Sequence, residues 1–177
     1  MAEGLRLFFL RHGRADRSAY HGDDDDLRPL TEEGRRRMRV EAEFIARLAA
    51  GIDLVVTSPL LRAAETAEIV AARLGLRDEL RSDPRLGHGF ALPELAALLA
   101  GLEGDRRRIL LVGHEPGFSE VIGELIGEGY VAMKKGALAR VDLLPGRKPR
   151  GRLIWLLQPG VLLSGDPARG GDGPGAG

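Results

Sequence analysis

Two adjacent side chains near the N-terminus, Arg11 and His12, are of the types that transfer a phosphoryl group. A guanidinium neutralises phosphoryl oxygens, and an uncharged imidazole nitrogen attacks phosphorus directly. The pair follows the apolar run 5–10, which is interrupted by Arg6, and precedes Gly13. Adjacent strand residues point to opposite faces, so both side chains serve one site only if the chain turns there, and glycine permits that turn. Backbone N–H groups freed by the turn would also bind an anion.

A third cation, Arg62, stands where a later strand is expected to end. It follows the Ser58-Pro59 pair, in which serine is expected to cap a helix and proline to occupy its first position. Arg62 would then lie in the first helical turn, where the positive end of the helix dipole already favours an anion.

A second histidine, His114, directly follows the apolar run 109–112, and Pro116 is expected to begin the next helix. Ligands of open α/β sheets bind at the carboxyl ends of the strands. Four side chains are therefore expected to meet at one edge of a sheet: Arg11, His12, Arg62 and His114.

Length and composition bound the kind of protein. The chain has 177 residues, 44% of them hydrophobic, which is enough for one domain with a sizeable core. Lys+Arg and Asp+Glu balance at 26 each, so no global field draws it to nucleic acid or to an anionic membrane. The absence of cysteine excludes disulfides, thiolate chemistry and cysteine-based zinc sites. Without an apolar stretch long enough to span a membrane, the sequence predicts a cytoplasmic protein.

Short apolar runs alternate with longer helical patterns, which indicates an α/β fold with a largely parallel sheet covered on both faces. Strands are expected at residues 5–10, 52–56, 109–112, 138–144 and 153–157. Helices are expected after the Thr31 cap, from Ser58-Pro59 to Leu74 with Gly75 as the stop, and at 93–102 and 117–126. One domain is thus expected over residues 1–163, followed by a Gly-rich disordered tail at 164–177.

Four segments carry a resemblance to a known family, and they occur in this order: Arg11-His12-Gly13, Arg28-Pro29-Leu30-Thr31-x-x-Gly34, Ser58-Pro59-x-x-Arg62-Ala63-x-x-Thr66-Ala67 and Gly113-His114-Glu115-Pro116. The chain resembles the histidine phosphatase superfamily, also described as phosphoglycerate mutase-like, from about residue 5 to residue 157. Its short length and the Arg-Pro-Leu-Thr segment resemble the SixA-type phosphohistidine phosphatases.

This resemblance implies a three-layer α/β/α sandwich and a covalent mechanism. His12 would be the nucleophile that accepts the phosphoryl group, and Arg11 and Arg62 would clamp phosphate, with Gly13 beside them. His114 would be a further phosphate ligand and electrostatic stabiliser. No metal and no organic cofactor are implied.

The sequence departs from the wider superfamily at the general acid. Many sugar-phosphate-cleaving relatives carry a glutamate shortly after the second helix, in a Leu-x-Glu segment, whereas His88 occupies the corresponding stretch here. An alkoxide leaving group needs a proton, but a phosphohistidine ring is protonated near its reference pKa of about 6.5 and leaves as neutral imidazole. The missing acid therefore favours a phosphohistidine substrate. His88, Asp83 or Glu94 could still donate a proton, and His88 is either a substrate-binding residue or an exposed loop residue.

The connections are too short for a large lid, so an open site is expected that admits a protein side chain. The acidic run 23–26 would flank the entrance, meet a basic partner or form a solvated loop. It lacks the glycine and the distant glutamate of an EF-hand, so no metal is assigned to it. His21 is expected to be another loop residue.

Three functions remain open. The first is a phosphohistidine phosphatase that acts on phosphotransfer proteins in signal transduction. The second is a broad-specificity phosphomonoesterase of small phosphorylated metabolites, and the third is an inactive module that binds phosphate or a phosphoprotein. The complete set of Arg11, His12, Arg62 and His114 argues against the inactive module. The oligomeric state is left open.

Overall fold

The computed structural model describes residues 4–18, 20–146 and 148–163. The segment 164–177, expected to be a disordered tail, lies outside the described residues, so that expectation and the domain boundary at residue 163 stay predictions.

Within the described residues, six strands form one sheet with the order β3-β2-β4-β1-β5-β6. The strands are β1 (Arg6–Arg11), β2 (Leu54–Thr57), β3 (Leu80–Ser82), β4 (Arg108–Gly113), β5 (Leu138–Leu143) and β6 (Gly151–Leu157). The first four strands in this order run parallel to one another, whereas β5 is antiparallel to β1, and β6 is antiparallel to β5. The prediction of a largely parallel sheet is confirmed.

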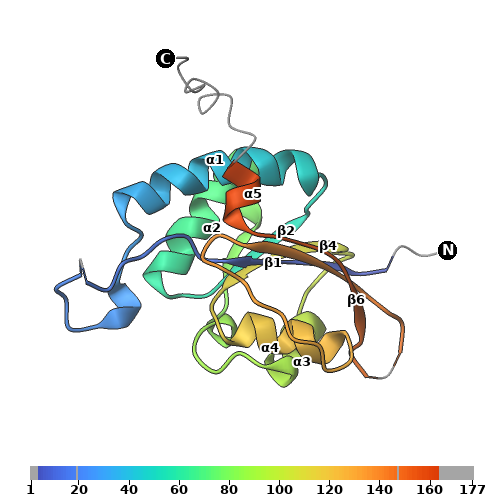
Figure 1. Ribbon diagram of the computed structural model, residues 1–177. Coiled ribbons are helices and arrows are strands. Elements are labelled where there is room, and N and C mark those ends of the chain that lie inside the picture. The colour runs from blue at the N-terminus through green and yellow to red at the C-terminus, as the bar shows by residue number, and fades with distance from the viewer. Residues whose placement is uncertain (1–3, 19, 147, 164–177) are drawn as a thin grey trace, which may run out of the picture.

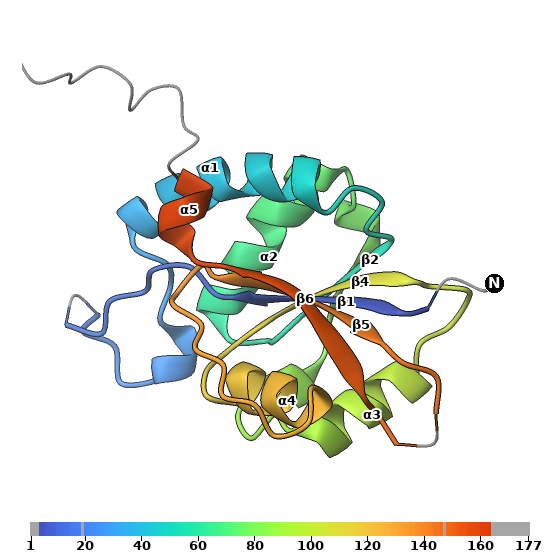
Figure 2. The ribbon, with the colours of Figure 1, turned by 45° about the vertical axis from the view of Figure 1, so that its right-hand side comes forward.

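Helices cover both faces of the sheet. They are α1 (Glu32–Leu48), α2 (Leu61–Leu74), α3 (Leu92–Ala100), α4 (Gly117–Leu125) and α5 (Pro159–Leu163). Figure 1 shows α1, α2 and α5 on one face and α3 and α4 on the other, and Figure 2 shows the same layers after a rotation. Three short 3₁₀ turns complete the chain: η1 (Asp25–Leu27), η2 (Arg77–Glu79) and η3 (Pro84–Leu86). The expected three-layer α/β/α sandwich is confirmed.

Strand β1 lies in the middle of the sheet and contributes to the core on both faces. Its alternate side chains fall into two apolar clusters, with Phe9 on the side of α3 and α4 and Phe8 on the side of α1 and α2. The ring of Phe9 packs edge-on against Phe118 of α4, with centroids 5.2 Å apart. Burial on both faces anchors β1 and so places its carboxyl end, where the candidate site begins.

The start of α1 is fixed by a cap and by a close backbone approach. As predicted, the side chain of Thr31 caps the helix by accepting a hydrogen bond from Gly34 N–H. The Thr31 N–H in turn donates to the carbonyl oxygen of Arg14 at 2.9 Å. A Cβ atom at Gly34 would come within van der Waals overlap of that same carbonyl oxygen. The first turn of α1 therefore packs directly on the loop that leaves β1.

Several elements differ from the sequence-based expectations. The expectation that Ser58 caps α2 with Pro59 at its first helical position is wrong, because α2 begins at Leu61 and Leu60 is its N-cap residue. Pro116 is the N-cap residue of α4 rather than its first residue. Strand β3 and helix α5 were not expected from the sequence. The left-handed Gly75 (φ 70°) does end α2, as predicted.

No helix among the described residues is both long enough and apolar enough to cross a membrane.

Replacing Gly34 with alanine should push the first turn of α1 away from Arg14. We expect Gly34→Ala to lower the free energy of unfolding by roughly 1–3 kcal/mol, because a methyl group is forced against a backbone carbonyl. Urea denaturation measures the effect. The matched control is Gly160→Ala in α5, where a Cβ atom would meet nothing within 4 Å. Equal stability of the two variants would contradict this account of Gly34.

Candidate active site

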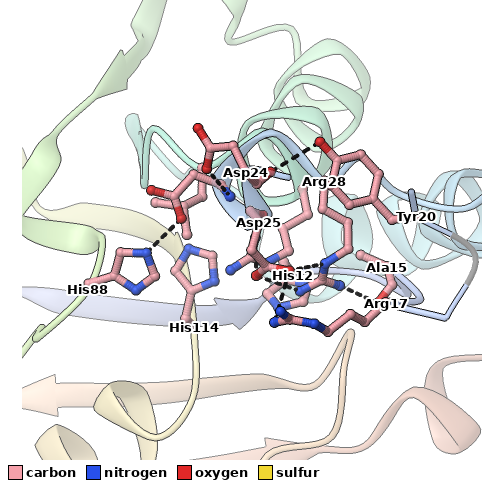
Figure 3. Close-up of polar contacts among 12 residues, drawn as sticks. His12, Ala15, Arg17, Tyr20, Asp24, Asp25, Arg28, His88 and His114 are labelled. Atoms are coloured by element: carbon pink, nitrogen blue, oxygen red, sulfur yellow. Dashed lines mark hydrogen bonds and ion pairs between the residues drawn. The ribbon is translucent and has the colours of Figure 1, made fainter. Parts of the chain in front are cut away.

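The segments that follow β1, β2 and β4 bring the four predicted residues together at the carboxyl edge of the sheet. His12 follows β1 directly, and its N–H donates to the carbonyl oxygen of Gly113 at the end of β4 at 3.0 Å. His114 follows Gly113, and its ring centroid lies 5.1 Å from that of His12. Figure 3 shows the two rings side by side. Arg62 enters from the first turn of α2.

His12 is a buried imidazole held in one tautomer. Its Nδ1 atom lies 2.8 Å from the carbonyl oxygen of Gly13, an acceptor, so Nδ1 carries the proton and Nε2 keeps a free electron pair. The side chain is only 5% exposed. Burial lowers the pKa of His12 to about 3, the Gly13 carbonyl opposes the shift, and the charges of His114, Arg62 and Arg11 add to it. At neutral pH the ring is therefore uncharged and able to act as a nucleophile.

Two guanidinium groups lie beside this ring, that of Arg11 partly buried and that of Arg62 buried. Arg11 donates from Nη1 to the carbonyl oxygen of Met133 at 2.6 Å, and Arg62 donates from Nη1 to the carbonyl oxygen of Asp25 at 2.8 Å. Burial lowers the pKa of both arginines, but an arginine remains charged at neutral pH. The Nε atom of each is buried and has no hydrogen-bond partner among the described residues. Two poorly solvated cations beside a neutral imidazole form an attractive site for an anion.

His114 is oriented by a serine that the sequence assigned to another role. Its Nε2 atom lies 2.8 Å from the hydroxyl oxygen of Ser58, which is fully buried and also accepts from Leu60 N–H at 3.2 Å. Burial, followed by the charge of Arg62, lowers the pKa of His114 to about 4, so this ring is also neutral. Ser58 thus orients a site histidine instead of capping α2. The Ser-Pro pair after a strand marked this position, but not its partner.

The turn that carries His12 is tied to α2 and to the segment before β5. Gly13 N–H donates to the Thr66 hydroxyl at 3.0 Å, and this hydroxyl donates to the carbonyl oxygen of Arg62 at 2.7 Å. On the other side, Gly136 N–H lies 3.1 Å from the carbonyl oxygens of both Arg11 and His12. The expectation that backbone N–H groups of this turn are free for an anion is therefore wrong for His12 and Gly13. Thr66 instead links the turn that carries His12 to α2, the helix that carries Arg62.

The acidic run is more ordered than a solvated loop. Asp24 caps η1, and the carboxylate of Asp25 pairs with Arg28 at 2.9 Å and lies 3.6 Å from Arg62. Asp26 Oδ1 lies 2.7 Å from Nε2 of His88. The run thus flanks the candidate site and supports one of its arginines, which corrects the solvated-loop alternative.

Of the three candidate proton donors, His88 lies beside the site. Its charge acts on His114, and its side chain is 72% exposed. Asp83 instead caps η3 and pairs with Arg85 at 2.6 Å, which lowers its pKa and keeps it ionised. Glu94 lies in the first turn of α3. Among the described residues, no group of three or more His, Asp or Glu side chains is placed to hold a metal ion.

Comparisons with known proteins agree with this geometry. The sequence profile of the Histidine phosphatase superfamily (branch 1) matches residues 7–88. An uncharacterized protein of Picosynechococcus is 40% identical over 66% of this chain and 70% of its own length. A probable phosphoglycerate mutase GpmB of Cronobacter sakazakii is 34% identical over 82% of this chain and 67% of its own. The chain belongs to the histidine phosphatase superfamily, and this membership indicates phosphatase activity.

Within the superfamily the chain is of the SixA type. Phosphohistidine phosphatase SixA of Escherichia coli is 29% identical over 88% of this chain and 94% of its own length. The structure of the protein histidine phosphatase SixA complexed with tungstate superposes with a TM-score of 0.75 at 28% identity, covering 89% of this chain and 99% of that one. A mycobacterial glucosyl-3-phosphoglycerate phosphatase shares the fold, with a TM-score of 0.67 at 21% identity. The superposition covers 86% of this chain and 98% of that one.

Removing the Thr66 hydroxyl should loosen the turn that carries His12. We expect Thr66→Val to lower the free energy of unfolding by about 1–3 kcal/mol, because the buried Gly13 N–H loses its acceptor. Turnover should fall by about tenfold or more as His12 loses its orientation. Urea denaturation and the hydrolysis of an aryl phosphate measure the two effects. Thr66→Ser keeps the hydroxyl and should retain most of the stability and most of the turnover. A Thr66→Val enzyme with the stability and turnover of wild type would rule out this role of Thr66 in holding the turn.

The stability of the protein should depend on pH through its two neutral site histidines. Below a pH of about 6.5 the unfolded chain protonates both rings, whereas the folded protein does so only near pKa values of about 3 and about 4. The free energy of unfolding should therefore fall as the pH is lowered through this window. Urea titrations at several pH values give the slope of the free energy of unfolding against pH. In His12→Asn this slope should be smaller than in wild type by the equivalent of about one proton. Equal slopes would contradict the uncharged state of His12.

Proposed function

We propose that this protein is a phosphatase that removes the phosphoryl group from phosphohistidine on phosphotransfer proteins, with His12 as nucleophile, and that it acts in the cytoplasm. One observation carries the proposal: a neutral, buried imidazole has one nitrogen engaged by the Gly13 carbonyl and lies beside two partly desolvated guanidinium groups. This combination attracts a phosphoryl group and presents a nucleophile to it.

Binding comes first and depends on the arginines. The planar forks of Arg11 and Arg62 can each hold phosphoryl oxygens in a bidentate manner, which a lysine does not do. Because both groups are already partly desolvated, an incoming anion is attracted more strongly than it would be by fully hydrated cations. The two Nη1 atoms are held by backbone carbonyls, so the guanidinium groups are oriented before the phosphate arrives.

Nε2 of His12 then attacks phosphorus, and the bond from phosphorus to the leaving group breaks with its electron pair going to that group. The product on the protein is a phosphohistidine at Nε2, while Nδ1–H still donates to the Gly13 carbonyl. A water molecule next attacks phosphorus and releases inorganic phosphate and the free imidazole. Arg11, Arg62 and His114 stabilise the charge on the phosphoryl oxygens in both steps.

The choice of a phosphohistidine substrate rests on similarity and on chemistry. The similarity to SixA extends over nearly the whole of both chains. A phosphohistidine leaving group departs as neutral imidazole once its ring is protonated, so it demands little of the enzyme. The residues around the entrance include exposed side chains such as Arg17 and His88. A site bordered in this way suits a side chain presented by another protein.

A second candidate function, hydrolysis of small phosphorylated metabolites, is favoured by three observations. The fold is shared with a glucosyl-3-phosphoglycerate phosphatase, and the sequence is similar to a probable phosphoglycerate mutase. His88 beside the site also offers a proton to a more basic leaving group. An inactive binding module is disfavoured, because such a module has no need for a neutral histidine with a free nitrogen between two arginines.

The substrate class can be tested by comparing rates for wild type and His12→Ala on a phosphohistidine-bearing phosphotransfer domain and on a panel of sugar and nucleotide monophosphates. We expect the wild type to prefer the phosphodomain and His12→Ala to lose nearly all turnover, because the nucleophile is absent. A wild type that prefers a sugar or nucleotide monophosphate would instead support the second candidate function, hydrolysis of small phosphorylated metabolites. Residual activity of His12→Ala near that of wild type would end the proposed mechanism, and an inactive wild type would favour the binding module.

A further inference from the structure

Two exposed residues from distant parts of the chain meet at the entrance of the candidate site. His88 lies in the loop after η3, Asp26 lies in η1, and their side chains approach to 2.7 Å between Nε2 and Oδ1. Figure 3 shows His88 next to His114, which in turn lies next to His12. The contact therefore lies near His114, whose ring neighbours that of His12.

Both members of this pair are close enough for their charges to act on the phosphate-binding groups. The charges of His88 and Asp26 act on His114, and that of Asp26 also acts on Arg62. The side chains are nevertheless 72% and 46% exposed, whereas His12 is 5% exposed. The pair thus lies between solvent and the reacting groups, where a leaving group would emerge.

The covalent mechanism needs a proton donor at this place. When the bond from phosphorus breaks, the leaving oxygen or nitrogen gains an electron pair that a proton must neutralise unless the group is a weak base. Asp25 is paired with Arg28 and remains ionised, since that contact lowers its pKa. His114 is neutral, and its Nε2 atom is engaged by Ser58. His88, by contrast, is exposed, and its Nε2 atom lies 2.7 Å from the carboxylate of Asp26.

We propose that His88 is the general acid for the leaving group and that Asp26 is the residue that positions it. Nε2–H of His88 donates to the Asp26 carboxylate, so Nδ1–H is the proton left for transfer to the leaving group. This proton passes to the leaving oxygen or nitrogen as its bond to phosphorus breaks, which leaves His88 neutral. In the second step the attacking water returns a proton to Nδ1.

This inference rests on the proposed function and deepens it by naming the substrates that the site can process. With a donor in place, the leaving group need not be an already protonated imidazole. Oxygen leaving groups of higher basicity become accessible, so the same site hydrolyses phosphomonoesters as well as phosphohistidine. The absence of a glutamate in this stretch of the sequence then does not restrict the enzyme to phosphoramidates.

The test compares two esters that differ in how much protonation their leaving groups need. Formation of the phosphoenzyme is followed in single turnover with 4-nitrophenyl phosphate, whose leaving group is a weak base, and with phenyl phosphate, whose leaving group is a stronger one. His88→Asn should slow the reaction of phenyl phosphate by about 100-fold, within the usual range of general acid catalysis, and that of 4-nitrophenyl phosphate much less. His21→Asn, at the other exposed loop histidine, is the matched control and should affect neither ester.

Three outcomes would overturn the assignment of His88. An equal loss on the two esters would mean that the residue only shapes the entrance, and no loss on either would mean that it takes no part. The third is a larger loss of rate on phenyl phosphate than on 4-nitrophenyl phosphate in Glu115→Gln but not in His88→Asn. Glu115 is the alternative donor in this test because burial raises its pKa and because its carboxyl interacts with Arg11. A wild type that forms no phosphoenzyme with any substrate would instead overturn the proposed function.

Asp26 is tested in the same assay. Asp26→Asn should show the same preference for the weakly basic leaving group as His88→Asn, and Asp26→Glu should restore much of the phenyl phosphate rate. Asp23→Asn removes an exposed charge from the same acidic run and serves as the matched control. An Asp26→Asn enzyme that slows equally on both esters would show that Asp26 acts only on the phosphate clamp through its charge, and would overturn its positioning role.

Discussion

The structure depends on keeping one imidazole uncharged beside two guanidinium groups. In the proposed mechanism, the positive charges of Arg11 and Arg62 attract a phosphate. Burial, and to a lesser degree these same charges, disfavours protonation of His12. A protonated His12 would lose its nucleophilic electron pair and would repel the cations around it. In the proposed mechanism, the site therefore combines anion binding and nucleophile activation in one electrostatic arrangement. The cost is that several polar atoms near His12 are buried without partners, which an anion would offset.

This arrangement is supported by backbone groups and small side chains rather than by further charges. Thr66 joins the Gly13 turn to the Arg62 helix, and Gly136 N–H donates to the carbonyl oxygens of Arg11 and His12. Ser58 orients His114 from the end of β2. Ser58 and Thr66 belong to the β2–α2 unit and Gly136 to the segment before β5, so the distances within the site follow from the packing of the sheet and its helices. Supports of this kind limit side-chain motion without adding charges that would raise the pKa of His12.

The sequence predicted features that depend on local signals. Alternating apolar runs and caps such as Thr31 were enough for the fold class and for the four residues at the strand ends. Features that depend on distant partners were not predicted. Ser58 precedes a proline, a local cap signal, but its hydroxyl is bound by His114, which is 56 positions away. The pairing of Asp26 with His88 spans 62 positions and has no local signature. Strand β3 has three residues and pairs with one neighbour, too little to give an apolar pattern.

In the proposed mechanism, recognition of the leaving group is coupled to the phosphate clamp, because η1 contacts both Arg62 and His88. The carbonyl oxygen of Asp25 holds Nη1 of Arg62, and the next residue, Asp26, holds His88. A substrate that displaced η1 would therefore weaken the guanidinium that must bind its own phosphate. A phosphoryl group on a side chain that leaves the contact between Asp26 and His88 intact also leaves this turn in place. Selection among substrates then arises less from contacts to the phosphate, which all of them share, than from how far each leaving group disturbs the turn that supports Arg62.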